Sequence, residues 1–141
     1  MIRAFVDTNV LLRFLAGEPP EMADEATRLF AAVADGAATL IVDDVVIAEA
    51  VSVLSSFYKQ DAARVADVLR AFLVQEGIEA PSRDVLLHAL TFFEERRVDF
   101  VDALVAARML ASGVSSVFTF DAHFERLPGI QRLHPGDVVA G

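Results

Sequence analysis

The 141-residue sequence contains no cysteine, and its three histidines are far apart and share no spacing typical of metal ligands. Disulfide bonds, thiolate zinc sites and cysteine nucleophiles are therefore excluded. A metal ion bound by this chain must be held mainly by oxygen atoms, which are the ligands that Mg²⁺ and Mn²⁺ prefer.

The sequence also lacks a long apolar run. No stretch is long enough to cross a bilayer, and the opening segment MIRAFVDTNV has neither the apolar stretch nor the cleavage site of a secretory signal. We therefore expect a cytoplasmic protein that makes no membrane contact. Because 55% of the residues are apolar, the chain is expected to form a single domain, residues 1–141, around one core.

Basic residues are scarce in this chain. Twelve Lys and Arg residues stand against 21 Asp and Glu residues, so the formal net charge is −9. A broad basic surface that grips phosphate backbones is excluded, which counts against simple nucleic-acid binding. A nuclease is not excluded, because divalent cations held by carboxylates reverse the local sign of the charge. The acidity also suits a basic protein partner.

Apolar periodicity predicts short strands that alternate with helices. The expected strands are residues 2–6, 39–42, 78–80, 116–120 and 131–133, and the expected helices are about 10–15, 22–33, 45–58, 65–73, 82–97 and 99–113. This alternation predicts an α/β fold, a three-layer α/β/α sandwich around a short, mostly parallel sheet. Sites in such folds lie beyond the carboxyl ends of strands, where Asp7 and Asp121 follow the first and fourth expected strands.

Three acids have both an ordinary and a functional interpretation. Asp7 and Asp121 follow strands and can simply cap helices or form turns, where Asp is common. Glu49 stands in the helical segment VVIAEAVSVL, and its neighbours Val46 and Val53 place it on or beside the face expected to point to the core. Since this segment offers no Lys or Arg, an ion pair within the helix is excluded for Glu49.

Asp99 and Asp102 open the sixth expected helix, where the helix dipole favours acids. Asp99 is predicted to be the N-cap. Asp102 is predicted to point inward, because its helical neighbours Val105 and Ala106 are apolar. Asp99 stays a candidate for a peripheral metal ligand.

Acids at strand ends and acids on otherwise apolar helix faces are together what an oxygen-lined divalent site requires. Three or four carboxylates can hold one or two Mg²⁺ or Mn²⁺ ions, which orient water and stabilise an in-line displacement at phosphorus. Two carboxylates about 6 Å apart repel each other by roughly 2–3 kcal/mol at an effective dielectric constant of about 20. At least one of them is therefore expected to have a raised pKa.

Four segments resemble the motif blocks of the PIN-domain family in their usual order, in a chain whose length and composition resemble VapC-type toxins most. They are FVDTNVLLRFL (5–15), VIAEAVSVL (46–54), DFVDALVAARM (99–109) and VFTFDAHFERLPGI (117–130). The resemblance implies an α/β/α sandwich, usually dimeric, that hydrolyses RNA phosphodiesters with Mg²⁺ or Mn²⁺. It also implies a cognate antitoxin protein as a partner.

The same resemblance implies the roles of single residues. The acidic quartet that binds the metal and acts in catalysis is Asp7, Glu49, Asp102 and Asp121. The polar neighbours expected to orient carboxylates or water by hydrogen bonds are Thr8, Asn9 and Thr119. An alternative stays open: a PIN-like module that binds RNA or protein without turnover.

Two further residues keep two interpretations each. Arg13 follows the first motif and can reach a phosphate, or it can be a solvated helical arginine. His123 stands two residues after Asp121 and can touch substrate, or it can be an ordinary surface histidine.

Overall fold

The computed structural model describes residues 1–138. The chain consists of two compact units, the N-terminal unit (residues 1–83) and the C-terminal unit (residues 84–141). The last three residues of the expected domain, 139–141, lie outside the described residues. Within residues 1–138, the longest and most apolar helices fall short of what is needed to span a membrane.

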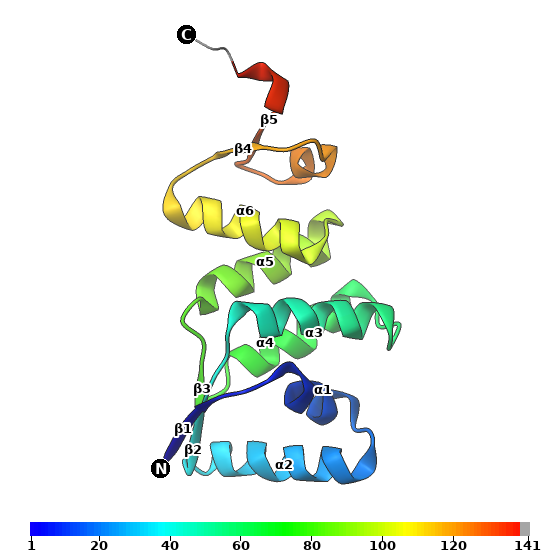
Figure 1. Cartoon of the computed structure of the whole chain (residues 1–141), viewed down its shortest axis with the longest axis vertical. Coiled ribbons are helices and arrows are strands. Elements are labelled where there is room, and N and C mark those ends of the chain that lie inside the picture. Colours follow the sequence, from blue (N-terminus) through cyan, green and yellow to red (C-terminus); the bar gives the residue numbers. More distant parts are fainter. Residues whose placement is uncertain (139–141) are drawn as a thin grey trace. The chain divides into compact units, whose positions relative to one another are not determined.

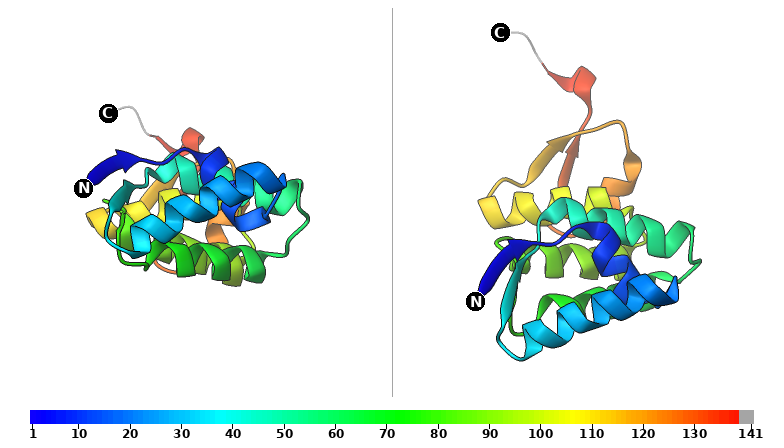
Figure 2. Two further views of the ribbon diagram at one scale, coloured as in Figure 1. Left: turned by 90° about the horizontal axis from the view of Figure 1, so that it is seen from below. Right: turned by 60° about the horizontal axis from the view of Figure 1, so that its bottom comes forward.

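The N-terminal unit combines three strands with four helices (Figure 1). Its elements are β1 (Ile2–Phe5), α1 (Thr8–Ala16), α2 (Pro20–Ala34), β2 (Ala38–Ile41), α3 (Asp44–Ser56), α4 (Ala62–Leu73) and β3 (Ile78–Glu79). The strands form one sheet in the order β1-β2-β3, and both pairings are parallel, as predicted. Two further views show β1 and β2 at one end of the helices of this unit (Figure 2).

Apolar side chains from all four helices form the core of the N-terminal unit. Leu11 of α1, Leu54 of α3 and Leu69 of α4 are completely buried. The ring of Phe30 on α2 stacks on Phe14 of α1 with centroids 4.3 Å apart. These contacts remove apolar surface from water, which is the main stabilising contribution to such a unit.

Strand β1 is exposed, although three of its four residues are apolar. All four of its residues are exposed, including Ile2 at 68% and Phe5 at 69%. The reason is its position, because β1 is an edge strand of the three-stranded sheet and pairs only with β2 within this unit. Only the following residue, Val6, is buried.

The C-terminal unit contains two long helices and a two-stranded parallel sheet. Its elements are α5 (Arg83–Arg96, of which the first residue belongs to the N-terminal unit), α6 (Phe100–Ser112), β4 (Ser116–Phe118), η1 (Ala122–Arg126, a 3₁₀-helix), β5 (Gln131–Leu133) and η2 (Pro135–Asp137, a 3₁₀-helix). Leu86 and Leu90 of α5 and Ala103 and Ala106 of α6 are completely buried. Every strand pairing within residues 1–138 is parallel, which confirms the predicted α/β class.

Strand β4 is shorter than expected. It ends at Phe118, whereas the sequence predicts a strand through Phe120. Thr119 still donates its backbone N–H to the carbonyl of Leu133, and the chain then turns into η1. Asp121 consequently lies at a turn between a strand and a 3₁₀-helix.

Candidate metal centre

Two of the candidate carboxylates lie close together in the C-terminal unit. Asp102 is half-buried in the first turn of α6, and Asp121 is the N-cap of η1. Burial raises the pKa of Asp102, and the charges of Asp121 and Asp99 together with a hydrogen bond to Asp121 raise it further. The expectation of a carboxylate with a raised pKa is confirmed at Asp102.

Asp121 is the more acidic carboxyl group of this pair. The backbone N–H of His123 donates a 2.8 Å hydrogen bond to Asp121 Oδ1, and this bond is the largest cause of the lowered pKa of Asp121. The imidazole Nδ1 of His123 lies 3.4 Å from the same oxygen, and a hydrogen bond with Asp102 lowers the pKa of Asp121 as well. The two shifts have opposite directions, so Asp102 is the carboxyl group of the pair that is more easily protonated.

Hydrogen bonds hold the backbone around Asp121 in place. The hydroxyl oxygen of Thr119 accepts a 2.9 Å hydrogen bond from the backbone N–H of Asp121. The guanidinium of Arg132 on β5 donates to the carbonyl oxygens of Thr119 at 3.4 Å and Phe120 at 3.2 Å. A third bond, 3.1 Å long, joins Arg132 to the carboxylate of Glu125 on η1.

Arg132 therefore fixes the chain on both sides of Asp121. It is 22% exposed and makes charge-assisted contact with Glu125, which is stronger than a contact between neutral groups. Sequence analysis missed this residue, because nothing in its local pattern sets it apart from other arginines. The observation that could have identified Arg132 is the pairing of β4 with β5, which places Arg132 opposite Val117.

Asp99 is an N-cap, as predicted. Its Oδ2 accepts a 3.2 Å hydrogen bond from the backbone N–H of Val101 at the start of α6. The negative charge of Asp99 also contributes to the raised pKa of Asp102. Asp102, rather than Asp99, is the half-buried acid of this helix start, which agrees with the predicted division of roles.

Asp7 occupies the N-cap position of α1 without acting as a side-chain cap. Its backbone carbonyl accepts from Val10 N–H at 3.1 Å, but its carboxylate makes no capping hydrogen bond. The carboxylate is exposed, whereas the adjacent Thr8 is 4% exposed and Asn9 is exposed again. Capping, the ordinary interpretation of Asp7, therefore fails for its side chain.

Glu49 lies in the middle of α3 and points away from the core. The expectation that it lies on or beside the core-facing side is wrong, because Glu49 is exposed and Val45, one turn before it, is 70% exposed. The core of α3 is instead made by residues such as Ile47 and Ala50, which are completely buried. Apolar residues on both sides of this helix made its inward face ambiguous from sequence.

Asp7 and Glu49 belong to the same unit, on helices α1 and α3 that pack against each other. Neither side chain makes a hydrogen bond or an ion pair with any other residue of the range 1–138. Over the same range, no three histidine or acidic side chains are grouped closely enough to hold a metal ion. The close carboxylates in this part of the chain are the pair Asp102 and Asp121.

Residues 4–130 match the PIN domain family. The chain belongs to this family. No curated protein sequence matches it. Among solved structures, it is similar to the crystal structure of VapBC2 from Rickettsia felis bound to a DNA fragment from their promoter. The identity is 19% and the TM-score 0.40, over 95% of this chain and 98% of that chain.

Membership of the PIN domain family confirms the predicted PIN-type α/β fold. PIN domains are generally nucleases, and they typically depend on divalent metal ions. The matched residues 4–130 include all four candidate acids.

Proposed function

We propose that this chain is a cytoplasmic ribonuclease that depends on Mg²⁺ or Mn²⁺ and acts as the toxin of a toxin–antitoxin pair. The observation that carries the proposal is the close pair of carboxyl groups Asp102 and Asp121, with oppositely shifted pKa values, in a chain of the PIN domain family. Interacting acids with shifted pKa values are common where carboxyl groups act together on a ligand or substrate. The resemblance of the chain's length and composition to VapC-type toxins supports the finer assignment.

The chemistry of the donors fits a divalent cation. Asp102 and Asp121 offer oxygen atoms whose mutual repulsion a cation would relieve. In the proposal Asp7 and Glu49 complete the ligand set, so that the whole chain, residues 1–141, works as one nuclease domain. Thr8, Asn9, Asp99 and Thr119 support these ligands by hydrogen bonding. When bound, the cation orients water and stabilises the charge that develops on the phosphate.

The residues of the chain prepare this chemistry. Coordination by Asp102 would require its ionised form, and its raised pKa therefore makes binding of a cation compete with protonation. Thr119 and Arg132 fix the backbone of Asp121, which limits the positions that its carboxylate can take. The Asp7 carboxylate makes no capping bond and is therefore available as a ligand.

The proposed partners are an RNA substrate, a cognate antitoxin and a second copy of the chain. The antitoxin would inhibit by placing an arginine or lysine near the acidic residues, where it substitutes for the positive charge of the metal. The net charge of −9 supports a basic partner. The alternative function, a PIN-like module that binds RNA or protein without turnover, retains the fold but predicts no cleavage.

The deciding experiment is a cleavage assay on a set of single-stranded RNAs with chelator, Mg²⁺ or Mn²⁺. We expect no cleavage in chelator and recovery on adding either metal. Asp7→Asn and Asp102→Asn are each expected to lower kcat/KM by at least about 100-fold, because even outer-shell partners of metal ligands contribute about 10–100-fold. Asp24→Asn is the matched control, since Asp24 is an exposed acid of α2, and it is expected to retain full activity.

Cleavage that persists in excess chelator would rule out the metal-dependent mechanism. Full activity in both Asp7→Asn and Asp102→Asn would rule out the proposed ligands. If the chain bound RNA but cleaved none of the RNAs tested, the alternative function, a PIN-like module that binds RNA without turnover, would be correct.

A further inference from the structure

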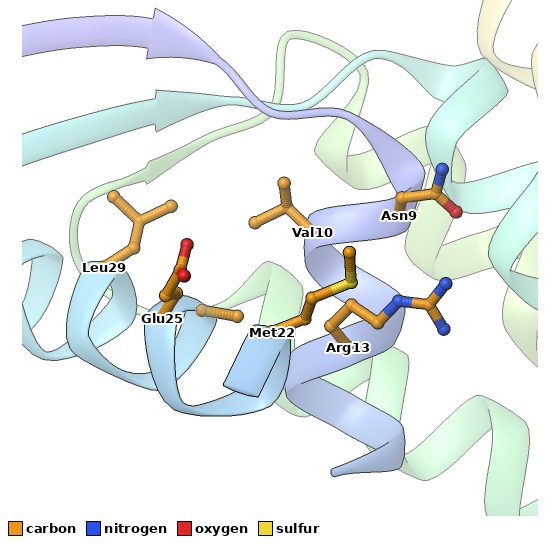
Figure 3. Close-up of a pocket in the computed structure, with 7 residues that line it drawn as sticks. Asn9, Val10, Arg13, Met22, Glu25 and Leu29 are labelled. Atoms are coloured by element: carbon orange, nitrogen blue, oxygen red, sulfur yellow. The ribbon is translucent and has the colours of Figure 1, made fainter. Parts of the chain in front are cut away.

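A pocket of about 360 Å³ lies between α1 and α2 in the N-terminal unit (Figure 3). Its apolar wall includes Val10, Met22 and Leu29, and its polar groups are the side chains of Asn9, Arg13 and Glu25. A volume of this size lies within the range of sites for small ligands, which is roughly 300–1,000 Å³. The residues that line this pocket belong to the N-terminal unit, whereas the carboxylate pair Asp102 and Asp121 belongs to the C-terminal unit.

Arg13 is the unusual residue of this pocket. The residue is half-buried, and its Nε atom is buried without any hydrogen-bond partner among residues 1–138. A buried N–H group without an acceptor is unfavourable, so most such groups in proteins are paired. The solvated-arginine interpretation therefore does not account for the Nε–H group of Arg13, which lacks an acceptor within the described residues.

Other half-buried arginines of the chain have acceptors. Arg83 donates to the carbonyl oxygen of Leu73 at 2.8 Å, and Arg132 binds Glu125 and two carbonyls. Arg70 is paired with Asp67 at 3.1 Å. Among the residues that the structure describes, Arg13 is thus the half-buried cation whose acceptor is missing.

The position of Arg13 on α1 links the pocket to Asp7. Asn9 and Arg13 are four residues apart, and Figure 3 shows both side chains on the same side of α1. With a rise of 1.5 Å per residue, Arg13 lies about 9 Å along the helix axis from Asp7, and Asn9 lies between them. A ligand held by Arg13 and Asn9 would therefore reach toward the Asp7 end of the helix.

The charged groups of the pocket, Arg13 and Glu25, are opposite in charge and lie at different ends of it. Figure 3 shows Met22 between the guanidinium of Arg13 and the carboxylate of Glu25. A phosphate matches the Arg13 end, because a guanidinium binds it through paired N–H groups and the Asn9 amide adds a donor. A carboxylate at the other end repels phosphate but accepts hydrogen bonds from an amino group of a base. The apolar wall between them suits the flat face of a base.

We propose that this pocket binds one nucleotide of the RNA substrate beside the cleaved bond, with its phosphate on Arg13 and Asn9. The base lies against Met22 and Leu29, and Glu25 favours a base that carries an exocyclic amino group. This assignment rests on the proposed ribonuclease function and names a substrate subsite for it.

The first test is independent of activity. The resonance of Arg13 Nε–H is followed by ¹⁵N NMR in the full-length protein with chelator, during titration with CMP, UMP and inorganic phosphate. We expect saturable shifts with all three, tighter binding of CMP than of UMP, and weakest binding of phosphate. In Glu25→Gln the difference between CMP and UMP is expected to shrink. Absence of any shift of Arg13 overturns the subsite, and equal affinity for CMP and phosphate overturns the base-binding part.

The second test is kinetic and uses Arg13→Gln and Arg13→Lys. We expect KM for RNA to rise about 10-fold in Arg13→Gln with kcat within about twofold of wild type, and a smaller rise in Arg13→Lys. The slope of log(kcat/KM) against log salt concentration should fall by about 0.7, the value for one phosphate contact to a single strand. Arg28→Gln, an exposed cation of α2, is the matched control and should change neither quantity.

The outcomes separate this proposal from the proposed function. Failure of the wild-type chain to cleave RNA contradicts the function, whatever happens at Arg13. Normal cleavage with unchanged KM and salt slope in both Arg13 variants contradicts the subsite alone. Unchanged RNA kinetics combined with loss of inhibition by the antitoxin would show that the pocket binds protein, which also overturns the proposal.

Discussion

The two units of this chain carry their candidate acids in different states. In the C-terminal unit, Asp102 and Asp121 shift each other's pKa in opposite directions. His123 N–H donates to the Asp121 carboxylate, Thr119 accepts from the Asp121 N–H, and Arg132 donates to the carbonyls of the two preceding residues. In the N-terminal unit, Asp7 and Glu49 are exposed and make no side-chain hydrogen bond to any residue between 1 and 138. One pair of acids is organised by the protein itself, and the other pair depends on solvent or on a ligand.

This difference between the two units predicts how a substitution acts in each of them. Near Asp102 and Asp121, a change alters a network of coupled groups, so neighbouring residues matter as much as the acids. Near Asp7 and Glu49, few groups depend on the carboxylates, so a change acts mainly through what the carboxylate binds. The effect of removing one neighbour, of adding metal and of changing the pH should therefore differ between the units.

The largest expected effect among the neighbours is that of Arg132. Arg132→Leu removes the two hydrogen bonds to the backbone carbonyls before Asp121 and the one to the Glu125 carboxylate. We expect kcat/KM for RNA to fall about 10- to 100-fold and the metal concentration needed for half-maximal activity to rise, as for other residues that orient metal ligands. Arg132→Lys keeps the charge but cannot reach all three acceptors, so an intermediate loss is expected.

Arg3→Leu is the matched control in the other unit. Arg3 also binds a carboxylate through two hydrogen bonds, to Glu79 at 2.8 and 3.0 Å, but it touches none of the candidate acids. We expect less than a twofold change in activity. If Arg132→Leu and Arg3→Leu behaved alike, the positioning role of Arg132 would be wrong.

The next effect is stabilisation by metal. A ligand that binds only the folded state at about 100 times its Kd raises the free energy of unfolding by about 2.7 kcal/mol, which corresponds to a rise in Tm of about 5–10 °C here. We expect this rise with Mg²⁺ or Mn²⁺ in the wild type and in Asp24→Asn, and a much smaller rise in Asp7→Asn and Asp121→Asn. Thermal melting with chelator and with metal measures it, and equal shifts in all four proteins would show that these carboxylates do not bind the metal.

Much of the fold could be predicted from the sequence. The expected strand at 39–42 corresponds to β2 (Ala38–Ile41), and the helix expected at 22–33 corresponds to α2 (Pro20–Ala34). Their apolar periods and the cap and stop residues beside them are local signals. The 3₁₀-helices η1 and η2 were not predicted, because five- and three-residue segments are too short to show a period.

The candidate site was predictable only in part, for a related reason. Asp99 as cap and Asp102 as the half-buried acid follow from positions within one helix. The exposure of Glu49 and the role of Arg132 depend on how distant segments pack, since Arg132 reaches carbonyls 12 and 13 residues before it. Such tertiary contacts override local pattern.

The smallest expected effect is a pH dependence of stability with opposite signs at Asp102 and Asp121. The folded-state pKa of Asp102 is raised, so its contribution is fully present below its unfolded pKa and is lost as the pH rises through the folded value. The folded-state pKa of Asp121 is lowered, so its contribution is present above the unfolded pKa and is lost as the pH falls through the folded value.

In chelator, Asp102→Asn should therefore remove a decline in the free energy of unfolding that the wild type shows above about pH 4, near the ordinary value for Asp. Asp121→Asn should instead weaken the loss on the acid side of that value. Urea unfolding from pH 3 to 7 measures all three proteins. Parallel curves for the wild type and Asp102→Asn would show that the pKa of Asp102 is not raised in the folded state, and would remove the contrast between the units.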